Sequence, residues 1–317
     1  MTDAAPRAHL PLGSGGEFDA IRAMLRVWGT KASGIGDDAA LLTVPATESL
    51  VVSTDASVEG VHFRREWLTP REIGARAAAA ALSDLAAMAA TPIGLLLALG
   101  IPSSWRGELD ALAHGVGELA AAAGCPIVGG NVTRAGELSL TITVLGSCAR
   151  PLTRSGARPG DILYLTGTLG GPGAALDALL SGATPRDVDR ARFAAPRPRL
   201  AEARWLVERD ATAGIDVSDG LVADARHLAA ASAVRVTLDV ASLPCMEGIP
   251  PERAAASGEE YELLVAFPAR ARVDVEAFSA RFGMPLTLVG RVTEGEGVSL
   301  DRGGDRVDLP SGHDHLS

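Results

Sequence analysis

The sequence has only three cysteines, Cys125, Cys148 and Cys245, and no two of them form a CxxC pair. A thiolate zinc site and a disulfide framework both need paired or regularly spaced cysteines, so neither is predicted. We expect three buried, reduced thiols.

Lysine is nearly absent, since Lys31 is the single lysine among 29 basic residues. A phosphate-binding or Schiff-base lysine could only be Lys31, which has no glycine-rich loop around it. The chain also lacks a GxxxxGK[ST] sequence and a strand-linked GxGxxG sequence, which excludes a P-loop or Rossmann nucleotide site. A nucleotide bound here would need metal ions to hold its phosphates.

Long apolar runs are absent too: no stretch of about 18 apolar residues could span a membrane, and residues 1–18 do not have the pattern of a secretory leader. The net charge of −10 argues against a nucleic-acid or anionic-membrane binder, since both need a basic surface. We therefore expect a cytoplasmic protein without nucleic-acid or membrane partners. Its phosphate-bearing ligands would be held by metal ions or by local arginines.

The 317 residues, 47% of them apolar, are sufficient for two domains in which strands and helices alternate. Around Arg150 the sequence becomes rich in Arg, Pro and Gly, and we place a boundary there, between domains 1–150 and 151–317. The fold class is α/β (α+β), with two mixed domains. Strands are predicted at 49–57, 93–102, 125–131, 137–148, 162–167, 214–217, 234–240, 261–268 and 285–292. Helices are predicted at 70–90, 106–124, from about Gly173, at about 200–209, and at 220–232 and 269–281.

Four apolar stretches are interrupted by aspartate: GIGDDAALL (34–42), VVSTDASVEGVHF (51–63), ALSDLAAMAA (81–90) and GIDVSDGL (214–221). A carboxylate beside apolar sequence is costly to desolvate unless a cation or several donors meet it. Any single one could cap a helix or stabilise a turn. Four of them, without matching lysines, indicate a shared cation site.

The residue types at these breaks favour magnesium. Mg²⁺ prefers carboxylate, hydroxyl and water oxygens, whereas zinc and iron sites usually include Cys or clustered His, and neither accompanies these acids. The candidate ligands are Asp38, Ser53, Thr54, Asp55, Asp84, Asp216 and Asp219.

The motifs GIGDDAALL, STDASVEGVHF, LSDLAAMAA, VGGN, LTRSGARPGD, IDVSDGL and SGEEYELL, in this order, resemble those of the thiamine-monophosphate kinases of the PurM-like ATP-binding superfamily. The resemblance extends from about Gly34 to the terminal GHDHL. It implies a PurM-like two-domain fold. In that fold the N-terminal domain binds ATP with several Mg²⁺ ions and dimerises through its sheet, and the C-terminal domain is α/β.

The resemblance also implies a role for each matching position. Asp84 bridges several ions, and Asp84 and Asp219 are the catalytic residues, with Asp37 assisting Asp38. Asn131 joins the seven metal ligands named above. The nucleotide contacts are Gly130, Asn131, Arg154 and Ser218, and the acceptor contacts are His62, Glu259 and His313.

The function implied is direct, Mg²⁺-assisted transfer of a phosphoryl group from ATP to thiamine monophosphate, giving thiamine diphosphate in a homodimer. Two alternatives stay open. One is another PurM-like kinase or synthase with a different small phosphorylated acceptor. The other is a catalytically silent nucleotide-binding homologue, although the retained aspartates argue against it.

Five positions depart from the family pattern, one of which is Leu316 in place of a closing Phe. Asn131 stands where the family usually has Asp, and an amide keeps one oxygen ligand but loses the charge. Ser257 and Glu260 replace Gly and Asp of the usual GGEDYEL, and His313 replaces a terminal aromatic. The metal chemistry is expected to be largely retained, with one Mg²⁺ bound more weakly or reorganised at Asn131, and the acceptor's identity is put in question.

Overall fold

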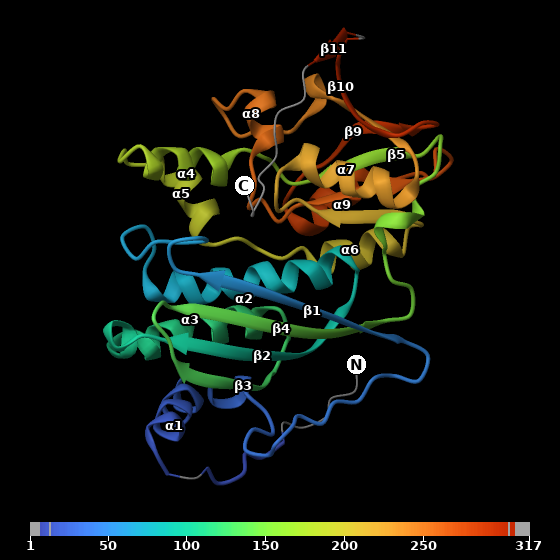
Figure 1. The fold of residues 1–317 in the computed structure, drawn as a ribbon. Helices are drawn as coiled ribbons and strands as arrows, with labels where there is room; N and C mark the ends of the chain where they lie inside the picture. The colour runs from blue at the N-terminus through green and yellow to red at the C-terminus, as the bar shows by residue number, and fades with distance from the viewer. Residues whose placement is uncertain (1–6, 13, 304, 308–317) are drawn as a thin grey trace. The chain divides into compact units, whose positions relative to one another are not determined.

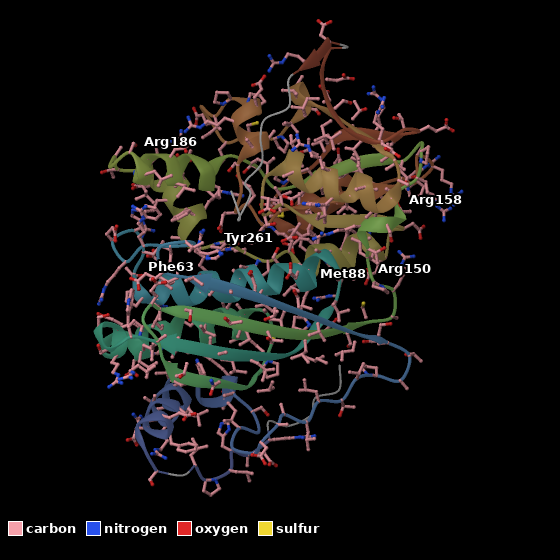
Figure 2. The ribbon with its side chains drawn as sticks, in the orientation of Figure 1. Phe63, Met88, Arg150, Arg158, Arg186 and Tyr261 are labelled. Atoms are coloured by element: carbon pink, nitrogen blue, oxygen red, sulfur yellow. The ribbon has the colours of Figure 1, made fainter. Side chains whose placement is uncertain are left out.

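The computed structural model describes residues 7–12, 14–303 and 305–307 of the 317-residue chain. The chain divides into two compact units (Figure 1). The first runs to Leu85 and includes Ala90–Ala149, and the second consists of Ala86–Ala89 and the chain from Arg150 onward. Residues 86–89 group with the second unit, in which the carbonyl of Met88 (Figure 2) accepts the Leu152 N–H at 3.1 Å.

The first unit is built on a four-stranded sheet with the order β1-β4-β2-β3. Its strands are β1 (Ser49–Val58), β2 (Thr91–Ile101), β3 (Ile127–Arg134) and β4 (Ser139–Cys148). β4 pairs antiparallel with β1 and β2, whereas β2 and β3 are parallel and are joined through a helix. One face of the sheet is apolar and buried, with Leu97, Leu99, Ile142 and Val144 at 0–4% exposure. On the other face Leu50 and Val52 are about half exposed, so this unit buries one side of its sheet.

Three helices complete the first unit: α1 (Gly16–Trp28), α2 (Pro70–Ala87) and α3 (Leu109–Ala122). Glycines let α2 and α3 approach closely, because a Cβ at Gly115 would lie 1.9 Å from the Arg71 carbonyl oxygen and one at Gly74 would lie 2.2 Å from that of Leu112. α1 packs on α3 through Trp28, whose indole N–H donates to the Ala113 carbonyl at 2.9 Å. This packing fixes α2, the helix that carries Asp84.

The second unit has a seven-stranded mixed sheet with the order β11-β10-β7-β9-β5-β8-β6. Its strands are β5 (Ile162–Thr166), β6 (Ala213–Asp216), β7 (Arg235–Asp239), β8 (Leu263–Phe267), β9 (Leu286–Thr293), β10 (Gly297–Arg302) and β11 (Asp305–Val307). Its helices are α4 (Gly171–Leu180), α5 (Asp187–Ala194), α6 (Leu200–Val207), α7 (Leu221–Ser232), α8 (Pro251–Ala256) and α9 (Val275–Phe282).

Helices cover both faces of this sheet. Along β8, Leu264 and Ala266 belong to a core that includes residues of α7 and α8. The alternate residues Leu263, Val265 and Phe267 belong to a second core with residues of α6 and α9. Because successive side chains of a strand point to opposite faces, the fully buried β8 reads as one continuous apolar run.

The secondary-structure predictions are confirmed at the strands and at most of the helices, with ends shifted by a few residues. The helix predicted at 269–281 is wrong at its start, because α9 begins at Val275, where the Asp274 carboxylate accepts the Ala277 N–H at 2.9 Å. The sequence did not predict α1, α5, α8, β10 or β11. Within the described part of the chain, no helix is both long and apolar enough to cross a membrane.

Candidate active site

In the first unit, Ser53 of β1 and Asp84 of α2 come together. The Ser53 hydroxyl donates a hydrogen bond to Oδ2 of Asp84, and both residues are half-buried. Asp55 shares the helix-facing side of β1 with Ser53, because residues two apart in a strand point the same way. Thr54 points to the opposite side, where its hydroxyl lies 3.0 Å from that of Thr143. The shared side of β1 and this hydrogen bond therefore bring together three of the predicted ligands: Ser53, Asp55 and Asp84.

Asn131 lies far from this group. It is on the edge strand β3 and pairs with Ala98 of β2, which is level with Thr141 of β4 and Ala56 of β1. The distance across the sheet is three strand spacings, or about 14 Å. Asn131 also faces the same side as Ala56, which is the side opposite Ser53 and Asp55. Within one chain, Asn131 and the Ser53–Asp84 pair cannot hold the same ion.

Gly130, next to Asn131, must be glycine. Its φ is +151°, and a Cβ would lie 1.9 Å from the carbonyl oxygen of Leu97 on β2. The backbone approach of β3 to β2 thus depends on this position.

Asp38 lies in an exposed loop between α1 and β1, and its N–H donates to Oδ1 of Asp37 at 3.0 Å. The two acids of the GDD sequence thus contact each other, with Asp37 supporting the backbone of Asp38. Among the residues that the structure describes, no group of three or more His, Cys, Asp or Glu side chains is arranged to hold a metal ion.

His62 follows β1 in a turn closed by the buried Phe63 (Figure 2). Its Nδ1 accepts the Val58 N–H at 3.2 Å. A nitrogen that accepts a hydrogen bond carries no proton, so the neutral ring carries its proton on Nε2. His62 is therefore set to donate through Nε2.

The second unit holds a second acidic loop between β6 and α7. Asp216 ends β6 and is 4% exposed, and Ser218 and Asp219 follow in the loop. A third acid, Asp224 in the first turn of α7, accepts the N–H groups of Ser218 at 3.0 Å and Asp219 at 3.1 Å through Oδ2. Burial, then the charges of Asp216 and Asp219, raise the pKa of Asp224 to about 8.

Glu259 lies directly against this loop. Its N–H donates to the Ser218 carbonyl at 2.6 Å, and the Tyr261 N–H donates to the Val217 carbonyl at 2.8 Å. The Tyr261 hydroxyl (Figure 2) donates to Oε2 of Glu259 at 2.9 Å. A Cβ at Gly258 would lie 2.8 Å from the Ser218 carbonyl oxygen, so this contact requires glycine. The predicted acceptor residue and the predicted nucleotide loop are thus joined through the backbone.

Arg154 begins a short 3₁₀ turn, Arg154–Gly156, and is exposed. Its carbonyl accepts a hydrogen bond from Ser232 of α7 at 2.6 Å, and the preceding Thr153 carbonyl accepts the Gly214 N–H of β6 at 3.1 Å. The turn is thus anchored beside the strand that ends in Asp216.

Comparison with known proteins identifies the chain. Two family models match it: the N-terminal domain of AIR synthase related proteins over residues 36–148, and their C-terminal domain over residues 158–302. Thiamine-monophosphate kinase from Escherichia coli (strain K12) is 37% identical over 302 residues, covering 90% of this chain and 92% of the relative. The chain belongs to the thiamine-monophosphate kinase family.

Solved structures of the thiamine-monophosphate kinase family share its fold. The crystal structure of the enzyme from Stenotrophomonas maltophilia K279a has a TM-score of 0.81 at 35% identity, covering 93% of this chain and 98% of that one. A structure of AaThiL complexed with AMPPCP and TMP has a TM-score of 0.74 at 30% identity, covering 94% and 96%.

Two of the departures from the thiamine-monophosphate kinase pattern concern buried residues. Glu260 is 3% exposed and Ser257 is 5% exposed, and they contact each other, since the Ser257 hydroxyl donates to Oε1 of Glu260 at 2.6 Å. Both side chains are therefore part of the core beneath Glu259. His313 lies outside the described residues.

Sequence reasoning missed Asp224, which organises the backbone of Ser218 and Asp219. Its signal was present in the sequence. An acid in the first turn of the helix that follows a loop can accept that loop's N–H groups, and Asp224 is the fourth residue of α7.

Proposed function

We propose that the protein catalyses ATP-dependent phosphorylation of thiamine monophosphate to thiamine diphosphate. The observation that carries the proposal is the 37% identity to a thiamine-monophosphate kinase over 90% of the chain. A structural relative complexed with AMPPCP and TMP supports it. In the reaction, the bond between the γ-phosphorus and the β–γ bridging oxygen breaks, and a phosphate oxygen of the acceptor bonds to the γ-phosphorus. ADP leaves, and the acceptor needs no strong general base because its phosphate is already ionised.

The donors described above fit Mg²⁺. The Ser53–Asp84 pair and the Asp216–Asp219 loop offer carboxylate and hydroxyl oxygens. Burial, and then the charges of Asp216 and Asp219, raise the pKa of Asp224 beside that loop. When bound, Mg²⁺ neutralises phosphate oxygens and orients the triphosphate. The proposed metal ligands are Asp38, Ser53, Thr54, Asp55, Asp84, Asn131, Asp216 and Asp219.

Because Asn131 and Ser53 lie on opposite faces and on opposite edge strands of the sheet, we assign them to different ions. Gly130, Asn131, Arg154 and Ser218 are the proposed nucleotide contacts. An always-charged guanidinium at Arg154 suits a phosphate.

For the acceptor we propose His62 and Glu259. The bond from Val58 to Nδ1 leaves Nε2 as the donor of the His62 ring, which suits a phosphate oxygen. Glu259 is held by Ser218 and Tyr261 and offers a carboxylate to a cationic or hydrogen-bonding group of the acceptor.

We further propose a homodimer and a cytoplasmic location. Leu50 and Val52 of the edge strand β1 are 51% and 55% exposed, and exposed apolar side chains on an edge strand favour association with a second copy. Among the described residues, Cys125, Cys148 and Cys245 are not joined in a disulfide, which is compatible with a reducing compartment. Light scattering at working concentration tests the dimer, and a monomer would contradict it.

The test of function is turnover of the purified protein with ATP, Mg²⁺ and a panel of phosphorylated acceptors that includes thiamine monophosphate. Chromatography would separate thiamine diphosphate and ADP. The proposal predicts the two products in equal amounts, with thiamine monophosphate as the best acceptor. A better turnover with another acceptor would support the first alternative, and ATP binding without any turnover would support a silent homologue.

A further inference from the structure

A buried charge cluster underlies the acceptor loop of the second unit. Residues Glu259 to Glu262 link α8 to β8, and Glu260 and Glu262 point into the core at 3% and 0% exposure. Glu259 and Tyr261 alternate with them and have left-handed backbones, with φ of +62° and +52°. Such φ values are unfavourable for residues other than glycine and persist where the surroundings hold them.

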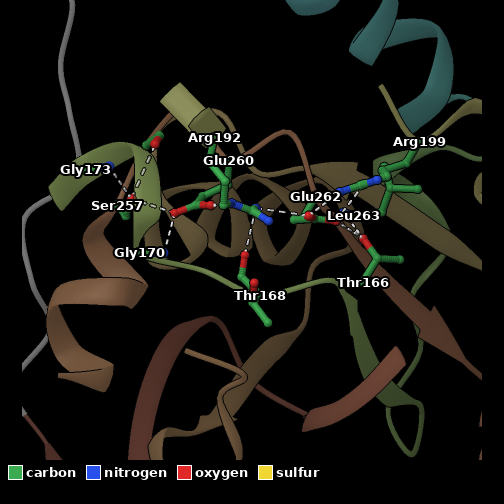
Figure 3. A network of polar contacts seen from close by, with 11 residues as sticks. Thr166, Thr168, Gly170, Gly173, Arg192, Arg199, Ser257, Glu260, Glu262 and Leu263 are labelled. Carbon is green, nitrogen blue, oxygen red and sulfur yellow. Dashed lines mark hydrogen bonds and ion pairs between the residues drawn. The ribbon is translucent and has the colours of Figure 1, made fainter. Parts of the chain in front are cut away.

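Arg192 of α5 links the two buried glutamates (Figure 3). Its Nη2 donates to Oε2 of Glu260 at 3.1 Å, to Oε1 of Glu262 at 3.1 Å and to the Thr168 carbonyl at 2.8 Å. The two carboxylates would otherwise repel each other in a medium of low polarity. Arg192 therefore offsets this repulsion by bonding to both carboxylates.

Each glutamate has a second set of partners (Figure 3). Oε1 of Glu260 accepts the Gly170 N–H and the Ser257 hydroxyl. Glu262 receives two bonds from Arg199, at 2.9 and 2.6 Å, and one from the Thr166 hydroxyl at 2.8 Å. Arg199 thus balances Glu262 by itself, and Arg192 is the guanidinium that balances Glu260.

The cluster reaches the candidate active site through the backbone. Glu259 lies between Ser218, which its N–H contacts, and Glu260, which Arg192 holds. The Tyr261 N–H is bonded to Val217, one residue before Ser218. A shift of Glu260 or Glu262 would therefore move the residue that presents its carboxylate beside the Ser218–Asp219 loop.

We propose that Arg192 is a positioning residue for the acceptor site: by bonding Glu260 and Glu262 together, it holds Glu259 and Tyr261 in their left-handed conformations against Val217 and Ser218. The link to the acceptor rests on the proposed function. The link to the backbone of residues 259–263 rests on the contacts alone.

The contacts also predict which substitution is tolerated. All three bonds come from the single atom Nη2, and within the described residues Nε of Arg192 is buried without a hydrogen-bond partner. A lysine ammonium has three donors on one nitrogen and carries no second buried N–H group. Arg192→Lys should therefore rescue the function that Arg192→Met loses.

The experiment compares Arg192→Met, Arg192→Lys and the control Arg186→Met. Arg186 precedes the same helix and is bonded to Asp189 at 2.6 and 2.9 Å, away from the acceptor loop. For Arg192→Met we expect KM for thiamine monophosphate to rise about tenfold, while KM for ATP changes by less than about threefold. Arg192→Lys and the control should leave both constants within about threefold of the wild type.

Hydrogen exchange gives a readout that needs no turnover. The amides of Glu259, Tyr261 and Leu263 are bonded to Ser218, Val217 and Thr166, and we expect them to exchange about tenfold faster in Arg192→Met but not in the control. If Arg192→Met does not fold, the double variant that combines Arg192→Met with Glu260→Gln takes its place, because it removes the carboxylate charge that Arg192 balanced. The KM values and the amide exchange rates are then measured on the double variant.

Unchanged exchange at these amides in the methionine variant would overturn the proposal. So would equal increases in the two KM values, or a folded lysine variant that behaves like methionine. If the wild-type protein does not phosphorylate thiamine monophosphate, the proposed function fails, and the exchange rates alone decide the role of Arg192.

Discussion

The buried Glu260 predicts a particular dependence of stability on pH. Burial raises the pKa of Glu260 from 4.5 to about 7, against the opposing effects of Arg192 and of the bonds from Ser257 and Gly170. A raised pKa means that the folded protein binds the proton more tightly than the unfolded chain does. The stabilisation from this group is therefore complete below about pH 4.5 and is lost as the pH rises through about 7.

The size of the effect follows from the shift. At about 1.4 kcal/mol per pKa unit, the free energy of unfolding should fall by up to about 3 kcal/mol across this interval because of Glu260. Glu260→Gln removes the titrating carboxyl group but keeps an oxygen that can accept from the Gly170 N–H and the Ser257 hydroxyl. The free energies of unfolding of the variant and the wild type should therefore differ by a constant plus the pH-dependent contribution of Glu260.

The assay is denaturant unfolding of the wild type and Glu260→Gln at several values from about pH 5 to about pH 8. The difference between the two proteins isolates Glu260, because other groups titrate in both. The charged neighbours of Glu260 are Arg192 and Glu262. The nearby Cys245 thiol ionises above this pH range, because burial and the charges of Glu252 and Glu260 raise its pKa.

The exposed Glu208 provides the matched control, since Glu208→Gln makes the same chemical change outside the core. The reasoning would be refuted if the free energy of unfolding of the wild type minus that of Glu260→Gln stays level or rises with pH. That result would mean that the attraction of Arg192 outweighs the burial of the carboxylate.

Three further predictions concern the candidate active site. Asp84→Asn should lower turnover at least about 100-fold. The unfolding midpoint should stay close to that of the wild type, because the amide oxygen can still accept a hydrogen bond from the Ser53 hydroxyl. Normal turnover would exclude Asp84 as a ligand. Asn131→Asp should lower the Mg²⁺ concentration that gives the half-maximal rate, with about 1–2 kcal/mol gained in the free energy of ion binding. If this Mg²⁺ concentration is unchanged at saturating ATP, Asn131 is not a ligand. Asp224→Ala should lower the free energy of unfolding by about 2–4 kcal/mol in denaturant unfolding, since two backbone N–H groups lose their acceptor. Asp224→Asn keeps an acceptor oxygen and should cost less than half as much. Equal losses in the two variants would contradict the hydrogen-bonding role.

The family and the acids could be predicted from the sequence because both are local patterns. An aspartate that interrupts an apolar run is visible in one dimension, and the spacing of GIDVSDGL already predicted a strand that ends in an acidic loop. The strand β6 and the helix α7 confirm that part. The scarcity of cysteine and lysine likewise narrowed the chemistry, because it leaves oxygen ligands and arginines to hold a phosphate-bearing substrate.

Other features depended on contacts between distant residues. Glu260 and Ser257 looked like changes at the acceptor, yet both are buried and bonded to each other, and Glu260 is also bonded to Gly170 and to Arg192, which is 68 residues away from it. No local pattern predicts that partner, because α5 is short and rich in charge.

The sequence by itself determined which residue types are available and the order in which strands, helices and acidic loops follow one another, since alternation and apolar runs are set by near neighbours. Only the tertiary structure decided which acids share a site. Strand register put Ser53 and Asp55 on the side of Asp84 and Asn131 on the other, and burial turned Glu260 and Glu262 inward and left Glu259 beside Ser218. The physical reason is that strand pairing and the pairing of buried charges join residues tens of positions apart, and only the folded chain brings them within bonding distance.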